Sequence, residues 1–190
     1  PYTENFNSVT TGIPSGWDNS EGTTTTSSYK WSYFTEGHDG GCVRFDSYNN
    51  TRNNTNFLKT PNMKLPADKN MQLTFWYMNP KGGDFSVYIS NDGGETYSTA
   101  LATCLVNASD WTEYSVNIPN DFKDNVVIVF KGTSNYGSGD AYIYLDDITV
   151  EQQSACAKPD AFAIDDITEN SATFSIARSE ERRVGKECRS

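Results

Sequence analysis

Few side chains in this sequence could act as catalysts. His38 is the only histidine, and it lies in a glycine-rich, loop-like segment, residues 36–41 (EGHDGG). A serine hydrolase needs a histidine beside an activated serine, and the nucleophile-elbow pattern G-x-S-x-G does not occur. Among 25 acidic residues, some pair would reach the carboxylate spacing of a glycosidase by chance, so the acids alone indicate nothing. We therefore expect that the chain is not an enzyme.

Two adjacent aspartates, Asp146 and Asp147, interrupt an apolar strand pattern near the end of the main domain. The apolar residues 143 and 145 share one parity, whereas the apolar residues 148 and 150 have the other. Both pairs can face one core only if a β-bulge at Asp146-Asp147 shifts the phase by one residue. Two carboxylates inside a sheet also need a partner, which could be a cation, a group of backbone N–H donors or an arginine.

Aromatic residues in polar loop segments are the candidates for ligand binding. Tyr48 and Tyr136 are flanked by Asn and Gly, and Trp31 lies beside a serine-rich stretch. Sugar rings stack on such side chains, so we select Trp31, Tyr48 and Tyr136 as candidate ligand-binding residues. The alternative for Trp31, as for Trp17 and Trp111, is that it fills an end of the fold.

The segment Ser90–Tyr97 (SNDGGETY) fits the Asp-box pattern S-x-D-x-G-x-T-(W/Y). Its glycines permit positive φ, and Asp92 can accept hydrogen bonds from turn N–H groups. We interpret the segment as a hairpin turn with no part in catalysis.

The elements that would position these residues are strands. The chain is rich in Asn, Gly, Ser and Thr, and it also holds 10 Phe, 11 Tyr and 4 Trp. This composition favours β-structure with short connections. Apolar residues alternate with period two, most clearly at 71–78 and 85–89, and residues 126–130 are apolar throughout, as in a strand buried on both faces. The ten predicted strands are 2–7, 31–34, 42–46, 56–59, 71–78, 85–89, 97–101, 112–118, 126–131 and 141–150. This spacing predicts an all-β jelly-roll β-sandwich.

Charge and cysteine usage exclude several classes. Acidic residues outnumber basic ones by 25 to 15, and the net charge of −10 excludes nucleic acid as a partner. Without an apolar run of about 18 residues, no membrane insertion is expected. The four cysteines match no zinc spacing. We expect Cys42 and Cys104 to be buried thiols, with a disulfide between them as the alternative.

Six segments of residues 1–151 resemble, in order, the motifs of cleaved adhesin domains, the jelly-roll modules of gingipain-type secreted proteases that are related to MAM domains. The segments are Phe6–Asn7 with Ile13–Trp17, Thr55–Pro61, Leu73–Tyr77, Ser86–Ser90, Val127–Lys131 and Leu145–Val150. The resemblance implies a non-catalytic adhesion module of a larger extracellular or bacterial cell-surface protein. Its partners would be a host surface protein or glycan and neighbouring domains of the same polypeptide. The alternative is a carbohydrate-binding module that targets a catalytic domain to polysaccharide.

The resemblance also implies a structural calcium site at the bulge. Calcium prefers carboxylate, amide and carbonyl oxygens, and the family places such ligands near the first and last strands. In this sequence the corresponding candidate ligands are Asn7, Asn56, Asp146 and Asp147, with Glu4 and Asp46 as substitutes. The alternative is that Asp146 and Asp147 only cap backbone N–H groups.

The C-terminal part differs from the main domain. Residues 152–177 begin with a polar linker, and Cys156–Ile176 resembles the start of a fibronectin type III domain, cut off after about two strands. Residues 178–190 are mostly charged and lack strand alternation, so we interpret them as a tag-like or artefactual tail, with a solvated natural tail as the alternative.

Overall fold

The computed structural model describes residues 2–81, 83–138 and 141–153, together with the backbone of residues 161–168 and 171–177. The chain forms two compact units, Pro1–Gln153 and Ser154–Ser190. Within the described part of the chain, no helix has the length and apolar character needed to cross a membrane.

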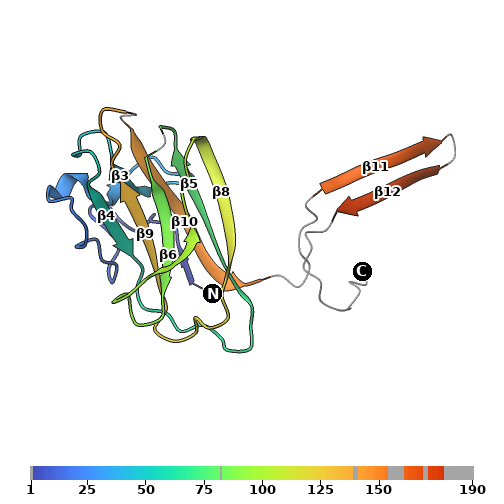
Figure 1. Cartoon of the computed structure of the whole chain (residues 1–190), viewed down its shortest axis with the longest axis horizontal. Coiled ribbons are helices and arrows are strands. Elements are labelled where there is room, and N and C mark those ends of the chain that lie inside the picture. The colour runs from blue at the N-terminus through green and yellow to red at the C-terminus, as the bar shows by residue number, and fades with distance from the viewer. Residues whose placement is uncertain (1, 82, 139–140, 154–160, 169–170, 178–190) are drawn as a thin grey trace. The chain divides into compact units, whose positions relative to one another are not determined.

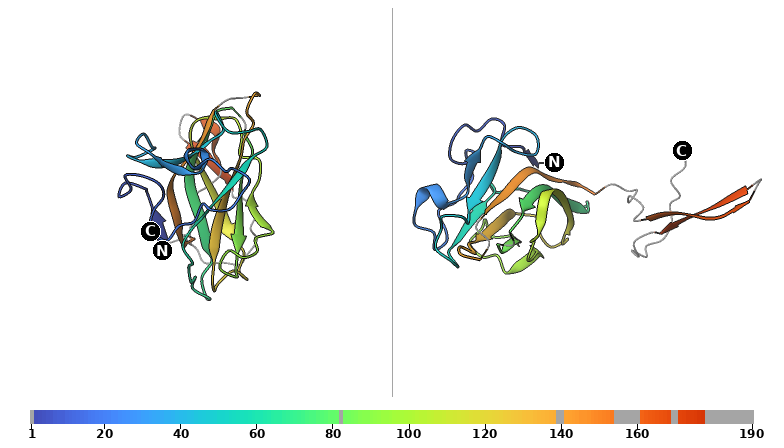
Figure 2. Two further views of the ribbon diagram at one scale, coloured as in Figure 1. Left: turned by 90° about the vertical axis from the view of Figure 1, so that its left-hand side faces the viewer. Right: turned by 90° about the horizontal axis from the view of Figure 1, so that it is seen from above.

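The first unit is a sandwich of two antiparallel sheets (Figures 1 and 2). A six-stranded sheet has the order β2-β3-β10-β5-β8, with β1 also pairing with β10, and a four-stranded sheet has the order β4-β9-β6-β7. The strands are β1 (Tyr2–Glu4), β2 (Ser32–Phe34), β3 (Cys42–Asp46), β4 (Thr55–Lys59), β5 (Met71–Asn79), β6 (Phe85–Ser90), β7 (Thr99–Ala102), β8 (Ala108–Ile118), β9 (Val127–Thr133) and β10 (Tyr142–Gln152). One 3-10 turn, η1 (Ser27–Tyr29), precedes β2.

All ten predicted strands are present, and the all-β sandwich prediction is confirmed. The largest difference lies in β8, which begins four residues before the predicted start at residue 112. The prediction that residues 126–130 are buried on both faces is also confirmed, since each is at most 3% exposed.

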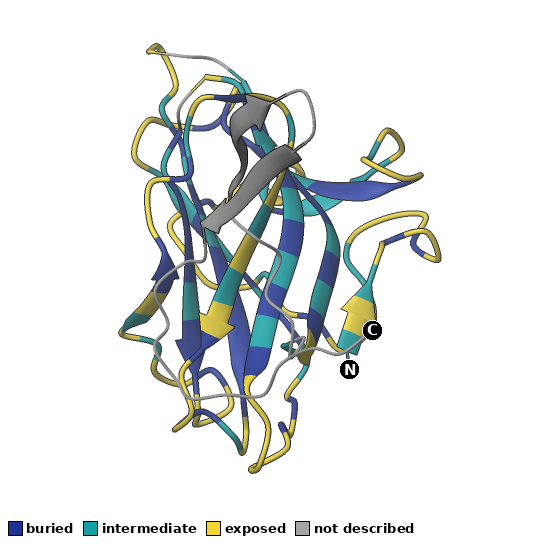
Figure 3. Cartoon of the chain, turned by 90° about the vertical axis from the view of Figure 1, so that its right-hand side faces the viewer, coloured by how far each residue is buried: buried dark blue, intermediate teal, exposed yellow. Residues whose placement is uncertain are grey.

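The core lies between the two sheets because buried and less buried residues alternate along the strands (Figure 3). In β5, Leu73, Phe75 and Tyr77 face the core, while Thr74 and Trp76 face outward. Rings pack edge to face or tilted across the interface, as in the pairs Phe75–Phe85, Phe75–Phe130 and Tyr77–Phe85. These contacts fix the two sheets face to face and leave the outer face of the six-stranded sheet to solvent.

The predicted bulge in β10 is present. The register between β10 and β5 shifts between Asp146 and Thr149, and Asp147 has a φ of +46°. The apolar residues on both sides of the bulge are buried, as the parity argument requires. The bulge also divides one edge of β10, because β3 pairs with residues 142–145 and β1 with residues 148–150. Asp146 and Asp147 therefore lie between the start of β3 and the end of β1.

The two cysteines of this unit are both free, so the disulfide alternative is wrong. Cys42 is buried, as expected, and burial raises the pKa of its thiol to about 12. Cys104 is exposed, which corrects the expectation of a second buried thiol. It lies just after β7, where the chain leaves the sheet with a positive φ of 53°.

The second unit contains a two-stranded antiparallel hairpin, β11 (Ala161–Thr168) and β12 (Ser171–Ala177). Two strands are what the sequence predicts here, whereas the fibronectin type III assignment stays a prediction. The interpretation of residues 178–190 as a tag-like tail falls outside the described residues.

Candidate functional site

Aromatic side chains gather on the outer face of the six-stranded sheet. On β10, Tyr142 and Tyr144 point outward because Ile143 and Leu145 between and beside them are in the core. The same alternation turns Trp76 outward on β5. Together with residues from β2, β3, β8 and two loops, these side chains form what we call the aromatic face: Phe34, His38, Arg44, Tyr48, Trp76, Trp111, Tyr142 and Tyr144.

The rings of the aromatic face are in contact from one end to the other. Tyr48 stacks on Tyr142 with centroids 6.1 Å apart, and Tyr142 lies 6.1 Å from Tyr144. Tyr144 in turn contacts Trp111, with the two centroids 6.1 Å apart. The last contacts are those of His38, 5.9 Å from Trp111 and stacked on Trp76 at 3.8 Å. Tyr48, which is 49% exposed, and His38 are exposed, and the other rings are half-buried, so the strip is a solvent-facing surface held in place by its own neighbours.

Arg44 lies within this strip as a cation held between two rings. Its guanidinium carbon is 3.9 Å from the centroid of Phe34 and 4.1 Å from that of Tyr142. Arg44 also pairs across the strands with Tyr144. Burial raises the pKa of the Tyr144 hydroxyl, and hydrogen bonding with Arg44 opposes that rise.

The loop of residues 36–41 covers the Trp76 end of the aromatic face. The His38 ring is nearly parallel to the Trp76 indole, at 12°, and its Nδ1 lies 2.8 Å from Asp147 Oδ2. Asn7 fixes the loop from the other side, since its Oδ1 accepts a bond from the Gly41 N–H (2.7 Å) and its Nδ2 donates to the Asp39 carbonyl (3.0 Å). The contacts with Asp147 and Trp76 thus hold the His38 ring in place within the aromatic face.

The two bulge aspartates have different partners. Asp146 is completely buried, and its carboxylate accepts bonds from the backbone N–H groups of His38 (2.8 Å), Asp39 (3.3 Å) and Asp147 (2.8 Å). Burial raises the pKa of Asp146 to about 6, although these N–H donors act in the opposite direction. Asp147 is part-exposed and bonds to His38. The capping alternative therefore describes the contacts of Asp146, whereas the Asp147 carboxylate contacts a side chain.

The structure brings only some of the predicted calcium ligands together. Glu4 lies at the end of β1 beside the bulge, where its Oε1 accepts the Phe6 N–H, and Asn7 holds the loop over Asp146. Asp46 pairs with Tyr142 at the far end of the β3–β10 ladder, and its carboxylate accepts bonds from Asn49. 

Asn56, on the four-stranded sheet, is occupied elsewhere. Its Nδ2 donates to the carbonyls of Asn19 and Glu21, and its Oδ1 accepts the Trp31 N–H. Among the described residues, no three His, Cys, Asp or Glu side chains are grouped to hold a metal. Three backbone N–H groups already donate to the Asp146 carboxylate, so the residues present fit capping better than calcium.

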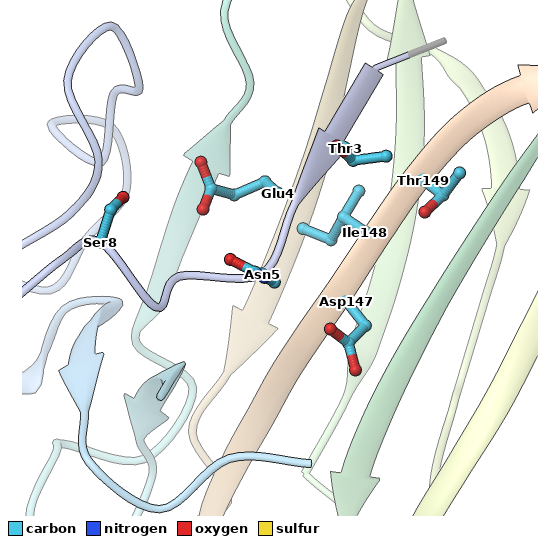
Figure 4. A pocket seen from close by; sticks show the side chains of 7 residues that line it. All are labelled: Thr3, Glu4, Asn5, Ser8, Asp147, Ile148 and Thr149. Carbon is cyan, nitrogen blue, oxygen red and sulfur yellow. The ribbon is translucent and has the colours of Figure 1, made fainter. Parts of the chain in front are cut away.

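An open, polar depression of about 430 Å3 borders the bulge (Figure 4). Glu4 and Asp147 contribute carboxylates from the two adjoining strands, and Asn5 and Ser8 come from the segment after β1. The other lining residues are Thr3, Ile148 and Thr149. The depression is separate from the aromatic rings and offers no flat apolar surface.

The predicted ligand-binding aromatics have three different outcomes. Tyr48 is part of the aromatic face, and Tyr136 is also 49% exposed, on a loop whose neighbour Asn135 is bonded to Ser47. Trp31 is fully buried, so selecting it as a ligand-binding residue was wrong. Its ring contacts Phe45 of one sheet and Phe85 of the other, which is the end-filling role of the alternative interpretation.

Most of the aromatic face was missed by sequence reasoning. The outward parity of Trp76 was visible in the alternation of β5, and Tyr142 and Tyr144 show the same signal in β10. Trp111 was interpreted as a filler of the sandwich end, but it contacts the rings of Tyr144 and His38 on the outer face. These rings come together because of the order of the strands in the sheet, and a local sequence pattern does not reveal that order.

The Asp box is a hairpin turn, as predicted. Asp92 accepts hydrogen bonds from the Ser90 hydroxyl and from the N–H and hydroxyl of Thr96, and these bonds lower the pKa of Asp92. Gly93 and Gly94 have φ values of +80° and +89°. Each polar group of Asp92 is thus engaged in holding the turn.

Solved structures similar to this chain include adhesin and carbohydrate-binding domains. The K3 cleaved adhesin domain of Lys-gingipain from Porphyromonas gingivalis W83 has a TM-score of 0.59 and 21% identity, over 79% of this chain and 97% of that domain. The K1 domain of the same protein gives 0.59 and 22%, over 80% and 98%. TmCBM61, solved with β-1,4-galactotriose, gives 0.52 and 18%, over 78% and 94%. At these identities the similarity shows the fold.

A search of curated proteins gives no match. The model of the MAM domain family (meprin/A5/mu) matches residues 8–157, which include nine of the ten strands of the sandwich, all but β1. This match covers most of the chain and coincides with the unit that carries the aromatic face, and the chain therefore belongs to the MAM domain family.

Proposed function

We propose that the chain is a non-catalytic adhesion module that binds glycans on the aromatic face. The single observation that carries this proposal is the continuous strip of rings on the outer face of the six-stranded sheet, from Tyr48 to Trp76. Monomeric proteins seldom expose a contiguous apolar patch without a binding role.

Stacked rings of this kind suit sugars. Tyr and Trp are large and rigid and combine an apolar face with a polar group, so they bind an amphipathic partner with little loss of conformational freedom. The Tyr142 and Tyr144 rings lie on adjacent outward positions of one strand, and Trp111 continues the row onto β8. An elongated strip matches an oligosaccharide chain better than it matches a single small molecule.

The contacts of His38 support a non-catalytic role. The only histidine of the chain stacks on Trp76 and bonds to Asp147, so its ring is used to shape the surface. A general base would instead face an activated nucleophile or a substrate proton within hydrogen-bond reach.

The similar structures support the same role and the same location. A bacterial adhesin domain and a module solved with a galactotriose both use this fold. By analogy, we place the chain outside the cell or on a bacterial surface, as one module of a longer polypeptide. Whether it attaches to a host or targets a catalytic domain to polysaccharide depends on the neighbouring domains.

A glycan array tests the proposal. Wild-type protein should bind at least one oligosaccharide class, and Trp111→Ala and Tyr144→Ala should each weaken that binding about tenfold or more. The matched control is Tyr88→Ala, which removes an outward ring from the other sheet and should leave binding unchanged. 

Two results would contradict the proposal. One is an array without any signal while the folded protein binds a host surface protein; the other is equal loss of glycan binding in Tyr88→Ala and Tyr144→Ala.

A further inference from the structure

Among the residues that the structure describes, no carboxylate forms an ion pair with Arg44, the cation in the aromatic face. We infer that the face selects acidic sugars and that Arg44 binds the sugar carboxylate. This inference rests on the proposed glycan binding and adds the ligand class and the residue that determines it.

Arg44 is held between two rings. Phe34 and Tyr142 lie 3.9 and 4.1 Å from the guanidinium carbon, on a strip of half-buried rings. A guanidinium has five N–H donors, so the cation–π contacts and the hydrogen bond with Tyr144 leave donors for a further acceptor. Two rings that hold the guanidinium in advance reduce the conformational freedom that Arg44 loses when a ligand binds.

The ion pairs of the described residues do not include Arg44. Lys59, Lys64 and Lys131 each have a carboxylate within 4.0 Å, whereas Arg44 has none, although acids outnumber basic residues by 25 to 15. Asp46, two residues further along the same strand, accepts bonds from Asn49. A half-buried guanidinium between two neutral rings can donate hydrogen bonds to the carboxylate of a ligand.

The chemistry of the partner follows from this geometry. The guanidinium fork matches a carboxylate with two parallel N–H···O bonds, while a sugar hydroxyl uses only one of those donors. The neighbouring rings stack on the sugar that carries the carboxylate. A sialic or uronic acid combines both features in a single residue.

The net charge of −10 does not oppose this inference, because charges more than about 8 Å apart are largely screened at physiological salt. The positions of the acidic side chains along the strip do indicate where the acidic sugar lies. Glu113 pairs with Trp76 and Asp147 contacts His38 at one end of the strip. At the other end Asp46 pairs with Tyr142, but its carboxylate accepts bonds from Asn49, and Arg44 lies between Phe34 and Tyr142. The carboxylate should therefore occupy the Tyr142 end.

The competing explanation is that Arg44 only clamps Phe34 onto Tyr142. Two variants separate the roles. Arg44→Met keeps an unbranched chain of similar length between the rings and removes the charge. Arg44→Lys keeps the charge and removes the planar fork. Arg52→Gln removes a charge of the same kind from an exposed loop position and is the matched control.

The experiment is calorimetric titration with two pairs of probes, sialyllactose against lactose and trigalacturonate against its methyl ester. Poly-L-glutamate is the peptide carboxylate control, and thermal melting checks that each variant is folded. Wild type and Arg52→Gln should bind at least one acidic probe about tenfold or more tightly than its neutral partner. Arg44→Met should reduce this preference, the ratio of the two affinities, to about twofold or less. Arg44→Lys should fall between them.

Equal affinity for acidic and neutral probes would overturn the inference and leave glycan binding intact. So would a preference for the acid that survives in Arg44→Met. Binding of poly-L-glutamate as tightly as the acidic sugars would overturn the assignment to sugars. Absence of binding to every saccharide probe would overturn the inference together with the proposed function.

Discussion

Trp31 and Trp111 carry the same side chain in opposite surroundings. Trp31 is fully buried, and its Nε1 donates to the Asn56 carbonyl (3.1 Å), whereas Trp111 contacts Tyr144 on the outer face. Trp31→Ala should therefore lower the free energy of unfolding by about 3–5 kcal/mol, because it leaves a cavity between the sheets. Trp111→Ala should lower it by about 1 kcal/mol or less and act on binding instead. Chemical denaturation of both variants checks this, and equal costs would contradict the assignment of Trp111 to the surface.

Gly40 and Gly12 form a second matched pair. Both have positive φ, +93° and +71°. A Cβ on Gly40 would overlap the Asn7 amide, whereas a Cβ on Gly12 would meet nothing within 4 Å. Gly12→Ala should cost about 1 kcal/mol from the left-handed backbone alone. Gly40→Ala should cost about 1–3 kcal/mol more, because Asn7 must give up its bonds to the loop. If denaturation midpoints fell equally in both variants, the contact between Asn7 and the loop would not matter.

The raised pKa of Asp146 predicts that the free energy of unfolding falls as the pH rises. Burial raises its folded pKa to about 6, while the unfolded value is about 3.9. Between these values the folded state binds more protons, so the stabilisation is fully present below about pH 4 and is lost as the pH rises through about 6. The free energy of unfolding of wild type, relative to Asp146→Asn, should therefore fall by about 1–3 kcal/mol from pH 4 to pH 7. Urea denaturation in EDTA measures it, and a constant difference, or one that grows with pH, would be inconsistent with a buried, proton-binding Asp146.

At the scale of elements, the divided edge of β10 is the main structural feature beside the aromatic face. β3 and β1 pair with successive parts of that edge, and the loop of residues 36–41 donates its N–H groups to Asp146 between them. The same loop places His38 on Trp76. One connection thus completes the sheet and shapes the end of the aromatic face.

Melting with and without calcium tests how the bulge in β10, between the residues that pair with β3 and with β1, is stabilised. Because N–H groups cap Asp146 and His38 pairs with Asp147, we expect the Tm to change by less than about 2 °C between 5 mM EDTA and about 5 mM calcium. A bound ion at a hundredfold excess over its Kd would add about 2.7 kcal/mol, which raises the Tm of a domain of this size by roughly 5–10 °C. A rise of that size in wild type that disappears in Asp147→Ala would instead support the calcium prediction.

The bulge and the strands could be predicted from sequence because both depend on local alternation. The parity change between Leu145 and Ile148 required an extra residue, and the structure has it at Asp146-Asp147. The aromatic face could not be predicted in this way, since Phe34, Tyr144 and Trp111 come from β2, β10 and β8, whose order in the sheet is a property of the topology. Trp31 was assigned wrongly because a polar neighbourhood in sequence does not report burial at the end of a sandwich.

At the scale of the whole molecule, the chain divides at Gln153 into two compact units. The core, the bulge and the aromatic face all belong to the first unit. Truncation after Gln153 should therefore leave the Tm within about 2 °C of that of the full chain, as judged by calorimetry, and should not change glycan affinity. A fall of about 8 °C or more would show that the second unit contributes to the stability of the sandwich.

The central claim is that the outer face of the six-stranded sheet binds the ligand. The four tryptophans report on it directly, because Trp76 and Trp111 lie on the aromatic face, whereas Trp17 and Trp31 are buried. The decisive measurement is titration of the 15N-labelled protein with an oligosaccharide that binds on the array, followed through the indole N–H signals. The account predicts that the Trp111 signal shifts in a saturable way while those of Trp17 and Trp31 stay in place. Saturable binding with an unmoved Trp111 signal would place the ligand elsewhere and contradict the claim.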